Sequence, residues 1–269
     1  KRIILALSIA SSFALVQQSD AAAPRVPSVQ QLGAFAQFSG FTLSPDGQHI
    51  AALRADGEER VIAVWRTDGL DKTPTLIGSN RMKIAGVSFI KNDRLAVSFW
   101  QPFDLRTDRV TRTFLSKLMI TDLEGKDWKE PLTLPRATSR AEELMQARVS
   151  PTVLDSLPND PHHILVVNNI GSNAGDVYRV DLRNYASERV QISGENVAGY
   201  VTDLDGELRA RLRTSVDSVG AYIAAEFRNS QSNAWEEHFR SYVKNRDQTQ
   251  IVGFSNDPNV AFIESNEGR

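Results

Sequence analysis

Short apolar runs separated by compact polar turns recur along this chain, and the first pair is the clearest. Phe41–Leu43 and Ile50–Arg54 are rich in apolar residues, and the turn S-P-D-G-Q-H separates them. Pro45 fixes φ for the first central position of a turn, Asp46 suits the second, and Gly47 accepts a positive φ. The segment is therefore predicted to fold back on itself as a β-hairpin.

Four weaker copies of this hairpin pattern follow, over Val87–Val97, Ser156–Val166, Thr202–Ala210 and Phe254–Phe262. The central turn positions are Asp46, Asn92, Asn159, Asp205 and Asn256, at intervals of about 46, 67, 46 and 51 residues. Such a period is typical of the four-stranded blades of a β-propeller, and the longer interval indicates an insertion. Each unit is then a small sheet that buries its faces only against its neighbours. The predicted fold class is all-β, an incomplete β-propeller of about four and a half blades with one short helical insertion.

Apolar alternation within each unit predicts the individual strands. In the first two units these are Phe41–Leu43, Ile50–Arg54, Val61–Trp65, Thr75–Ile77, Ile84–Phe89, Leu95–Trp100, Leu115–Asp122 and Pro131–Leu134. In the later units they are Ile164–Asn168, Gly175–Leu182, Arg189–Ile192, Val197–Val201, Leu208–Thr214, Tyr222–Arg228, Trp235–Tyr242, Gln250–Phe254 and Val260–Glu264.

Two insertions interrupt these units. The charged segment Gln101–Phe114 is predicted to be a polar loop. Ala137–Val149 is predicted to be helical because its apolar residues fall on one face, with Ser139 as N-cap and Glu142 completing a capping box. The chain stops after the second strand of the fifth unit, which would leave an unpaired edge, so we expect a part of a longer protein.

The N-terminus has the pattern of an export signal. A basic pair, Lys1-Arg2, precedes the apolar run Ile3–Val16, and the small residues Ser19 and Ala21 precede a cleavage position. The predicted organisation is a signal peptide over 1–21, a lead-in segment over 22–40 and a partial propeller domain over 41–269. We expect a periplasmic or secreted protein with no stable membrane anchor after cleavage, because the apolar run is too short to span a bilayer. A retained, uncleaved anchor is the alternative.

The composition excludes several kinds of functional site. The 31 basic and 33 acidic residues of the 269 give a net charge of −2, which provides no broad basic surface for nucleic acid. Cysteine is absent, which excludes disulfides, thiolate zinc sites and a cysteine nucleophile. The four histidines are not clustered with carboxylates at ligand spacing, so we expect no metal site and no cofactor. His162 and His163 are adjacent and would point to opposite sides of a strand, which favours solvated turn residues.

Three motifs carry a resemblance to a known family. They are the L-S-P-D-G-x-x-I-A hairpin from Leu43, the strand D-V-Y-R-V-D-L from Asp176, and the hairpin V-T-D-L-D-G-E-L-R-A-R from Val201. With the export signal, they resemble the N-terminal propeller of the prolyl oligopeptidase family. The likeness is strongest to exported bacterial dipeptidyl aminopeptidases and acylaminoacyl-peptidases, from about Leu32 to Arg269. The S-P-D-G hairpin also occurs in periplasmic TolB-like propellers, which bind partners and catalyse nothing.

The resemblance implies a function divided between two domains. In the family, a seven- or eight-bladed propeller caps an α/β-hydrolase domain that follows it in the chain. The hydrolase domain carries a Ser–Asp–His triad, with the serine on a G-x-S-x-G elbow. No G-x-S-x-G occurs in this sequence, so no catalytic residue can be assigned and the chain alone is expected to be inactive. The propeller would select short peptides for a catalytic domain encoded elsewhere. The alternatives are a non-catalytic TolB-like binding propeller and a propeller enzyme with its site on the ring.

Two glutamate pairs are candidates for substrate binding. The resemblance implies that Glu142 and Glu143, on the helical insertion, would bind the free α-amino group of a peptide through charge-assisted hydrogen bonds. The alternative is that they cap the helix and interact with its dipole. Glu236 and Glu237, beside Trp235, form a second pair, which also fits an edge strand with alternating exposure.

Overall fold

The computed structural model describes residues 36–80, 82–106, 110–133, 138–146, 149–170 and 173–266. The predicted signal peptide (1–21) lies outside the described residues, as does the lead-in as far as residue 35. From Gln37 onward the described chain belongs to one compact unit. Its first strand begins at Phe38, which is inside the predicted lead-in.

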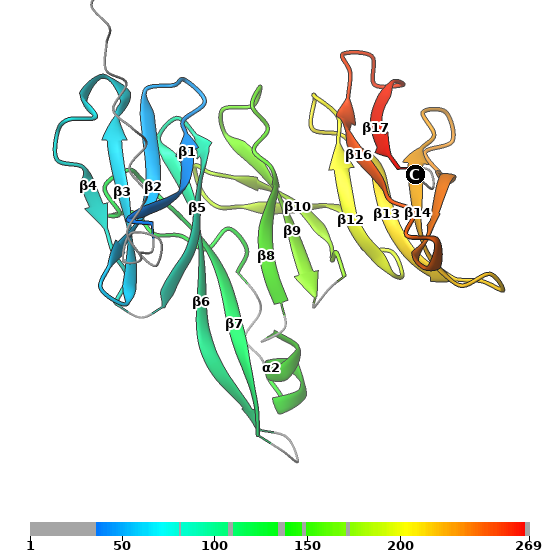
Figure 1. Cartoon of the computed structure of the whole chain (residues 1–269), viewed down its shortest axis with the longest axis horizontal. Coiled ribbons are helices and arrows are strands. Elements are labelled where there is room, and N and C mark those ends of the chain that lie inside the picture. The colour runs from blue at the N-terminus through cyan, green and yellow to red at the C-terminus, as the bar shows by residue number, and fades with distance from the viewer. Residues whose placement is uncertain are drawn as a thin grey trace, which may run out of the picture. The chain divides into compact units, whose positions relative to one another are not determined.

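The described residues form five successive antiparallel sheets in which consecutive strands pair (Figure 1). The first contains β1 (Phe38–Leu43), β2 (His49–Asp56), β3 (Glu59–Arg66) and β4 (Thr75–Ile77), and the second contains β5 (Lys83–Lys91), β6 (Arg94–Arg106) and β7 (Val110–Thr121). The third contains β8 (Val149–Asp155), β9 (His163–Ile170), β10 (Val177–Asp181) and β11 (Ser187–Gln191). The fourth contains β12 (Val197–Thr202), β13 (Leu208–Val216), β14 (Ala221–Arg228) and β15 (Trp235–Tyr242), and the fifth contains β16 (Thr249–Phe254) and β17 (Ala261–Ser265). The described helices are short: α2 (Arg140–Gln146) and the 3₁₀ turns η1 (Thr67–Gly69) and η2 (Val243–Asn245).

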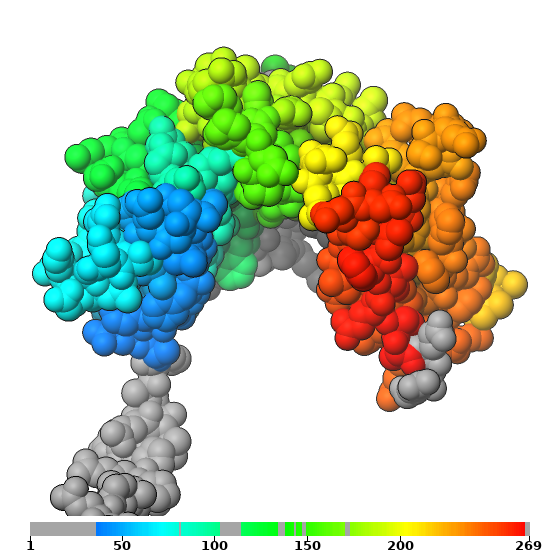
Figure 2. Space-filling model, turned by 90° about the horizontal axis from the view of Figure 1, so that it is seen from above, coloured from blue at the N-terminus to red at the C-terminus, as the bar shows by residue number. Residues whose placement is uncertain are grey.

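Apolar cores lie between consecutive sheets, which follow one another in chain order (Figure 2). Ile62 and Leu95 belong to the cluster that joins the first and second sheets. Ile120 and Val166 belong to the next cluster, and two further clusters join the third sheet to the fourth and the fourth to the fifth. Each sheet therefore buries its faces against its neighbours, as the blades of a propeller do. The fold is an incomplete β-propeller of about four and a half blades, with α2 as a helical insertion.

The first hairpin has the turn chemistry that its sequence predicts. Gly47 has a φ of 70°, and its N–H donates to the carbonyl of Ser44 at 2.9 Å. The Ser44 hydroxyl donates to Asp46 at 2.6 Å and accepts from the His49 N–H at 2.9 Å. The four later copies likewise connect the first and second strands of their sheets. The prediction of repeated hairpins is confirmed.

This up-and-down strand order defines two ends of the sheets. The turns between first and second strands, and those between third and fourth strands, share one end, which we call the turn edge. The turns between second and third strands, and the links from one sheet to the next, share the opposite end, which we call the arm edge. The β6–β7 hairpin and α2 both belong to the arm edge, as Figure 1 shows. Among the described residues, no helix combines the length and apolar character that crossing a membrane requires.

The long β6–β7 hairpin corrects the prediction of a polar loop over Gln101–Phe114. The ladder between the two strands continues to the pair formed by Arg106 and Val110. Val110–Phe114 consists of β-branched and aromatic residues apart from Arg112, and such residues favour strand structure. The charged residues of this segment are compatible with a strand, so they were not a sufficient reason to predict a loop.

Prolines explain two further differences. Pro131–Leu134 was predicted as an outer strand, but the described part of it, residues 131–133, is not a strand. Among the described residues, β7 has on that side an isolated bridge between Ile120 and Lys129. Continuing that bridge would place Pro131 opposite Leu118, and proline has no N–H to donate to the ladder. The reverse holds for β8, which was not predicted: it contains Pro151 but lies at the edge of its sheet, where proline is tolerated.

Candidate functional site

The repeated turns contact one another along the turn edge. The N–H of Asp46 in the first turn donates to the side chain of Asn92 in the second at 3.1 Å. The hydroxyl of Thr202, just before the fourth turn, donates to Asp155, just before the third, at 2.6 Å. The equivalent positions of the repeat thus link neighbouring sheets by hydrogen bonds.

Lys91 makes the corresponding link between the second and third sheets. Its residue is only 9% exposed, and its ammonium donates to the carbonyls of Ser156, Leu157 (2.9 Å) and Asp160 (2.5 Å). Burial lowers the pKa of Lys91 and outweighs the opposing effect of nearby carboxylates. The second sheet therefore places a cation within the loop of the third.

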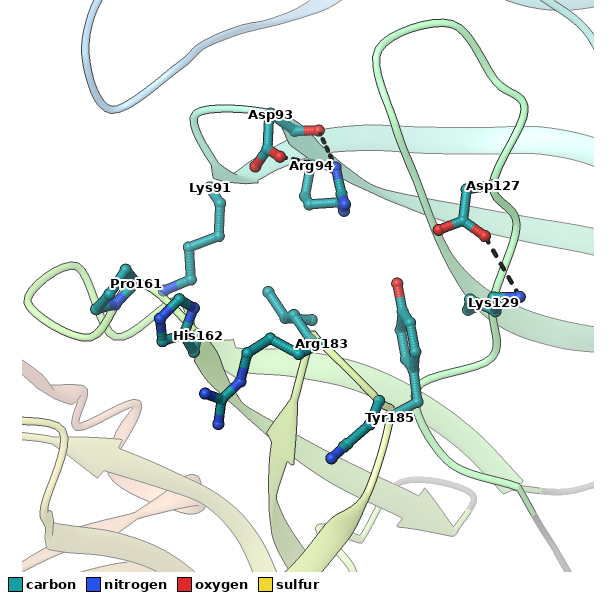
Figure 3. A pocket seen from close by; sticks show the side chains of 11 residues that line it. Lys91, Asp93, Arg94, Asp127, Lys129, Pro161, His162, Arg183 and Tyr185 are labelled. Carbon is teal, nitrogen blue, oxygen red and sulfur yellow. Dashed lines mark hydrogen bonds and ion pairs between the residues drawn. The ribbon is translucent and has the colours of Figure 1, made fainter.

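A cavity of about 510 Å³ opens beside this link, between the second and third sheets (Figure 3). Four segments of the turn edge surround it, and they contribute Lys91, Asp93, Arg94, Asp127, Lys129, Pro161, His162, Leu182, Arg183, Asn184 and Tyr185. The hydroxyl of Tyr185 points into the cavity in Figure 3, and burial raises the pKa of this phenol. Tyr185 lies in the turn between β10 and β11 and adopts a positive φ of 59°.

Positive charge exceeds negative charge in this lining, with four Lys or Arg side chains against two carboxylates. Arg94 donates to Asp93 at 2.8 Å, and Lys129 lies 3.3 Å from Asp127. The guanidinium of Arg183 donates to Asp181, which does not line the cavity. This hydrogen bond keeps the pKa of the Asp181 carboxyl well below its ordinary value. Three of the four cations of the lining thus already pair with a carboxylate, and Lys91 donates to backbone carbonyls.

Asp160 organises the loop below the cavity. It accepts hydrogen bonds from Nδ1 of His163 at 2.9 Å and from the guanidinium of Arg179. Burial raises the pKa of Asp160, but hydrogen bonds from the backbone of His162 and from His163 outweigh this effect, so its pKa lies well below the ordinary value. His162 is exposed at the cavity, whereas His163 is half-buried against Asp160, so the two rings have different environments. Within the described ranges, no group of three or more His, Asp or Glu side chains is arranged to hold a metal ion.

The predicted candidate Glu142 lies at the arm edge, at the opposite end of the sheets from the cavity. Its Oε2 accepts hydrogen bonds from the N–H (2.6 Å) and hydroxyl (2.8 Å) of Thr138, and Ser139 accepts from the N–H of Glu142 at 3.2 Å. The predicted helix cap is confirmed, although α2 is shorter than Ala137–Val149. These hydrogen bonds, led by the one from the Thr138 backbone, lower the pKa of Glu142. Glu143 follows in α2, and its side chain lies outside the description; binding of an amino group by this pair stays a prediction.

Glu236 and Glu237 lie on β15, the outer strand of the fourth sheet. Glu236 accepts from Asn229 at 2.9 Å, and Glu237 pairs with Arg240 at 2.7 Å. Both pairings are those of an exposed edge strand.

No pattern in the sequence indicated the cavity itself. Lys91 had a recognisable signal, because it is a lysine at the end of an apolar strand immediately before a repeated turn. Arg183 and Tyr185 had none, since they reach the cavity only through the packing of the third sheet on the second.

Comparison with known proteins is limited to the fold. No family model matches the sequence, and no match was found among curated proteins. The chain is similar to TolB from Acinetobacter baumannii, at 13% identity and a TM-score of 0.41, over 76% of this chain and 44% of that one. It is similar to the acylaminoacyl peptidase of Pyrococcus horikoshii, at 14% identity and a TM-score of 0.44, over 76% of this chain and 32% of that one.

A third similar structure is oligopeptidase B from Leishmania major, at 9% identity and a TM-score of 0.45, over 84% of this chain and 30% of that one. The chain thus spans less than half the length of each of these three proteins. At these identities the likeness concerns the repeated sheets alone, and it does not separate the peptidases from TolB.

Proposed function

We propose that this chain is the propeller part of an exported serine peptidase of the prolyl oligopeptidase type. Its role is to select short peptides for a hydrolase domain that is not contained in these residues. The observation that carries the proposal is the position of the three motifs on which the sequence resemblance rests. The S-P-D-G turn joins β1 to β2, D-V-Y-R-V-D-L contains β10, and V-T-D-L-D-G-E-L-R-A-R spans the turn from β12 to β13.

The two ends of the sheets have different roles in this proposal. At the turn edge, the cavity with its excess of positive charge accepts a carboxylate of a peptide. At the arm edge, Glu142 and Glu143 bind the free α-amino group, and the hydrogen bonds from Thr138 orient Glu142.

The decisive experiment is to read the coding sequence beyond the codon for Arg269 and to express the whole protein. A strand–G-x-S-x-G–helix segment, followed by Asp and His, should accompany hydrolysis of aminoacyl-nitroanilides that is abolished when the elbow serine becomes alanine. The present chain alone should give no turnover. A reading frame that ends without a hydrolase domain would overturn the peptidase proposal and support the TolB-like binding propeller.

A further inference from the structure

A β-bulge in β15, the outer strand of the fourth sheet, changes which of its side chains share a face. Phe227 of β14 pairs with Glu236, and Ala225 pairs with Phe239, with a register shift between the two pairs. In a regular strand residues 236 and 239 would point to opposite faces, but the extra residue His238 places both on the same face. Ala225 and Phe227 belong to the core between the fourth and fifth sheets. The bulge therefore directs Glu236 and Phe239 toward the fifth sheet.

A cavity of about 400 Å³ opens on this face, between the fourth and fifth sheets. Residues of the β14–β15 and β16–β17 turns also line it, so it belongs to the turn edge. Four aromatic side chains contribute to its wall: Phe227, His238, Phe239 and Phe254. The other three rings each meet Phe227 in a T-shaped arrangement, with centroids 5.3 to 6.3 Å away. Phe239 is 42% exposed, so the aromatic wall is accessible from solvent.

The accessible charge at this cavity is the carboxylate of Glu236. It is exposed, and its Oε1 accepts a hydrogen bond of 2.9 Å from a side-chain amide of the preceding turn. Among the described residues it forms no ion pair. Two arginines also line the cavity, but Arg209 already pairs with Asp203 at 2.8 Å. The guanidinium of Arg228 lies 5.3 Å from the ring of Trp235, which packs against the core on the other face of the sheet.

We propose that this cavity binds the side chain of a lysine in a partner peptide. The ammonium donates a charge-assisted hydrogen bond to Glu236, and the aromatic wall attracts the cation and covers its methylene stem. Lysine suits the site better than arginine, because Oε1 of Glu236 already accepts from Asn229 and a guanidinium binds best to two free oxygens. This inference does not depend on the peptidase proposal, because it concerns binding by the present chain alone.

The test uses the whole chain and pentapeptides that carry a neutral coumarin dye, with binding followed by fluorescence anisotropy. The probe is Gly-Ala-Lys-Ala-Gly, blocked at both ends so that the side chain supplies its only ammonium. One comparison peptide has norleucine in place of lysine, which keeps the apolar stem without the charge, and another has arginine. We expect saturable binding of the probe with a Kd below about 1 mM. The norleucine peptide should bind at least tenfold more weakly and the arginine peptide at least threefold more weakly.

The matched variants are Glu236→Gln and Glu237→Gln. Glu237 is the next carboxylate of β15, but it lies opposite Glu226 on the other face and pairs with Arg240 at 2.7 Å. Glu236→Gln should weaken probe binding at least tenfold, whereas Glu237→Gln should change it less than twofold. A third variant, Phe239→Leu, keeps an apolar side chain but removes one ring of the wall, and it should weaken binding at least threefold. Glu236 and Phe239 are exposed, so these variants should fold as the wild type does, which circular dichroism checks.

Three results would overturn the proposal. One is equal binding of the lysine and norleucine peptides, because the cavity would then accept any apolar side chain. Another is unchanged binding by Glu236→Gln. The third is a loss of binding in Glu236→Gln together with unchanged binding by Phe239→Leu, which would indicate a surface ion pair without any use of the cavity.

Discussion

Replacing Lys91 with methionine tests whether the link between the second and third sheets stabilises the fold. Methionine keeps the apolar stem but removes the ammonium, which leaves the carbonyls of Ser156, Leu157 and Asp160 without this donor. Hydrogen bonds to a charged group contribute about 1.5–3 kcal/mol each, and the cost of burying the ammonium offsets part of their sum. We therefore expect a loss of about 3 kcal/mol in the free energy of unfolding.

Urea unfolding followed by circular dichroism measures this effect. With a urea dependence of about 3 kcal/mol per molar, the midpoint should fall by about 1 M. Hydrogen exchange should rise most in the turns after β5 and β8, because each sheet depends on its immediate neighbours. The control is Lys129→Met, which alters a side chain that is 51% exposed in the same cavity and should cost less than about 0.5 kcal/mol. A Lys91→Met midpoint within error of the control would refute the reasoning.

Three further predictions concern the turns and the buried charges. Gly47→Ala should cost about 1 kcal/mol from its positive φ alone, since a Cβ there meets nothing within 4 Å. Gly125→Ala should cost more in thermal unfolding, because its Cβ would clash with the buried side chain of Ile77. Equal costs of the two substitutions would contradict this packing. The lowered pKa of Asp160 means that the folded chain takes up its proton at a lower pH than the unfolded chain, so stability should fall as the pH drops below about 4. Asp160→Asn should be less stable at pH 7, and its free energy of unfolding should decline less between pH 5 and pH 3. An unfolding free energy that falls with pH as steeply as in the wild type, measured by urea unfolding, would contradict this prediction. Glu226 is 5% exposed between two arginines, and Glu226→Gln should cost about 3 kcal/mol, whereas Glu237→Gln at the exposed edge should cost less than about 1 kcal/mol in the same assay.

Local patterns were sufficient to predict the regular part of the fold. All four strands of the fourth sheet were predicted within two residues, because apolar alternation and turn residues agree there. Two of the errors arose because proline has opposite effects in different contexts. Proline ended the outer strand of the second sheet at Pro131 but was accommodated in β8 at Pro151, and only the position of each strand within its sheet explains the difference.

The candidate site was less accessible to this reasoning. The capping of α2 by Ser139 and Glu142 is local, so the sequence predicted it correctly. The cavity at the turn edge instead combines residues from the second sheet, such as Arg94, with Tyr185 from the third. No spacing in the sequence encodes that proximity, because it arises from the packing of one sheet against the next.

The repeated turns that contact one another lie at one end of the sheets, and this affects how such a chain can change. The interval of about 67 residues between the second and third copies is accommodated mainly at the other end, by the long β6–β7 hairpin and α2. Sequence can therefore be gained or lost at that end while contacts such as the one between Asp46 and Asn92 keep their register. The arm edge of this scaffold can therefore diverge in evolution while the contacts between turns at the turn edge are kept.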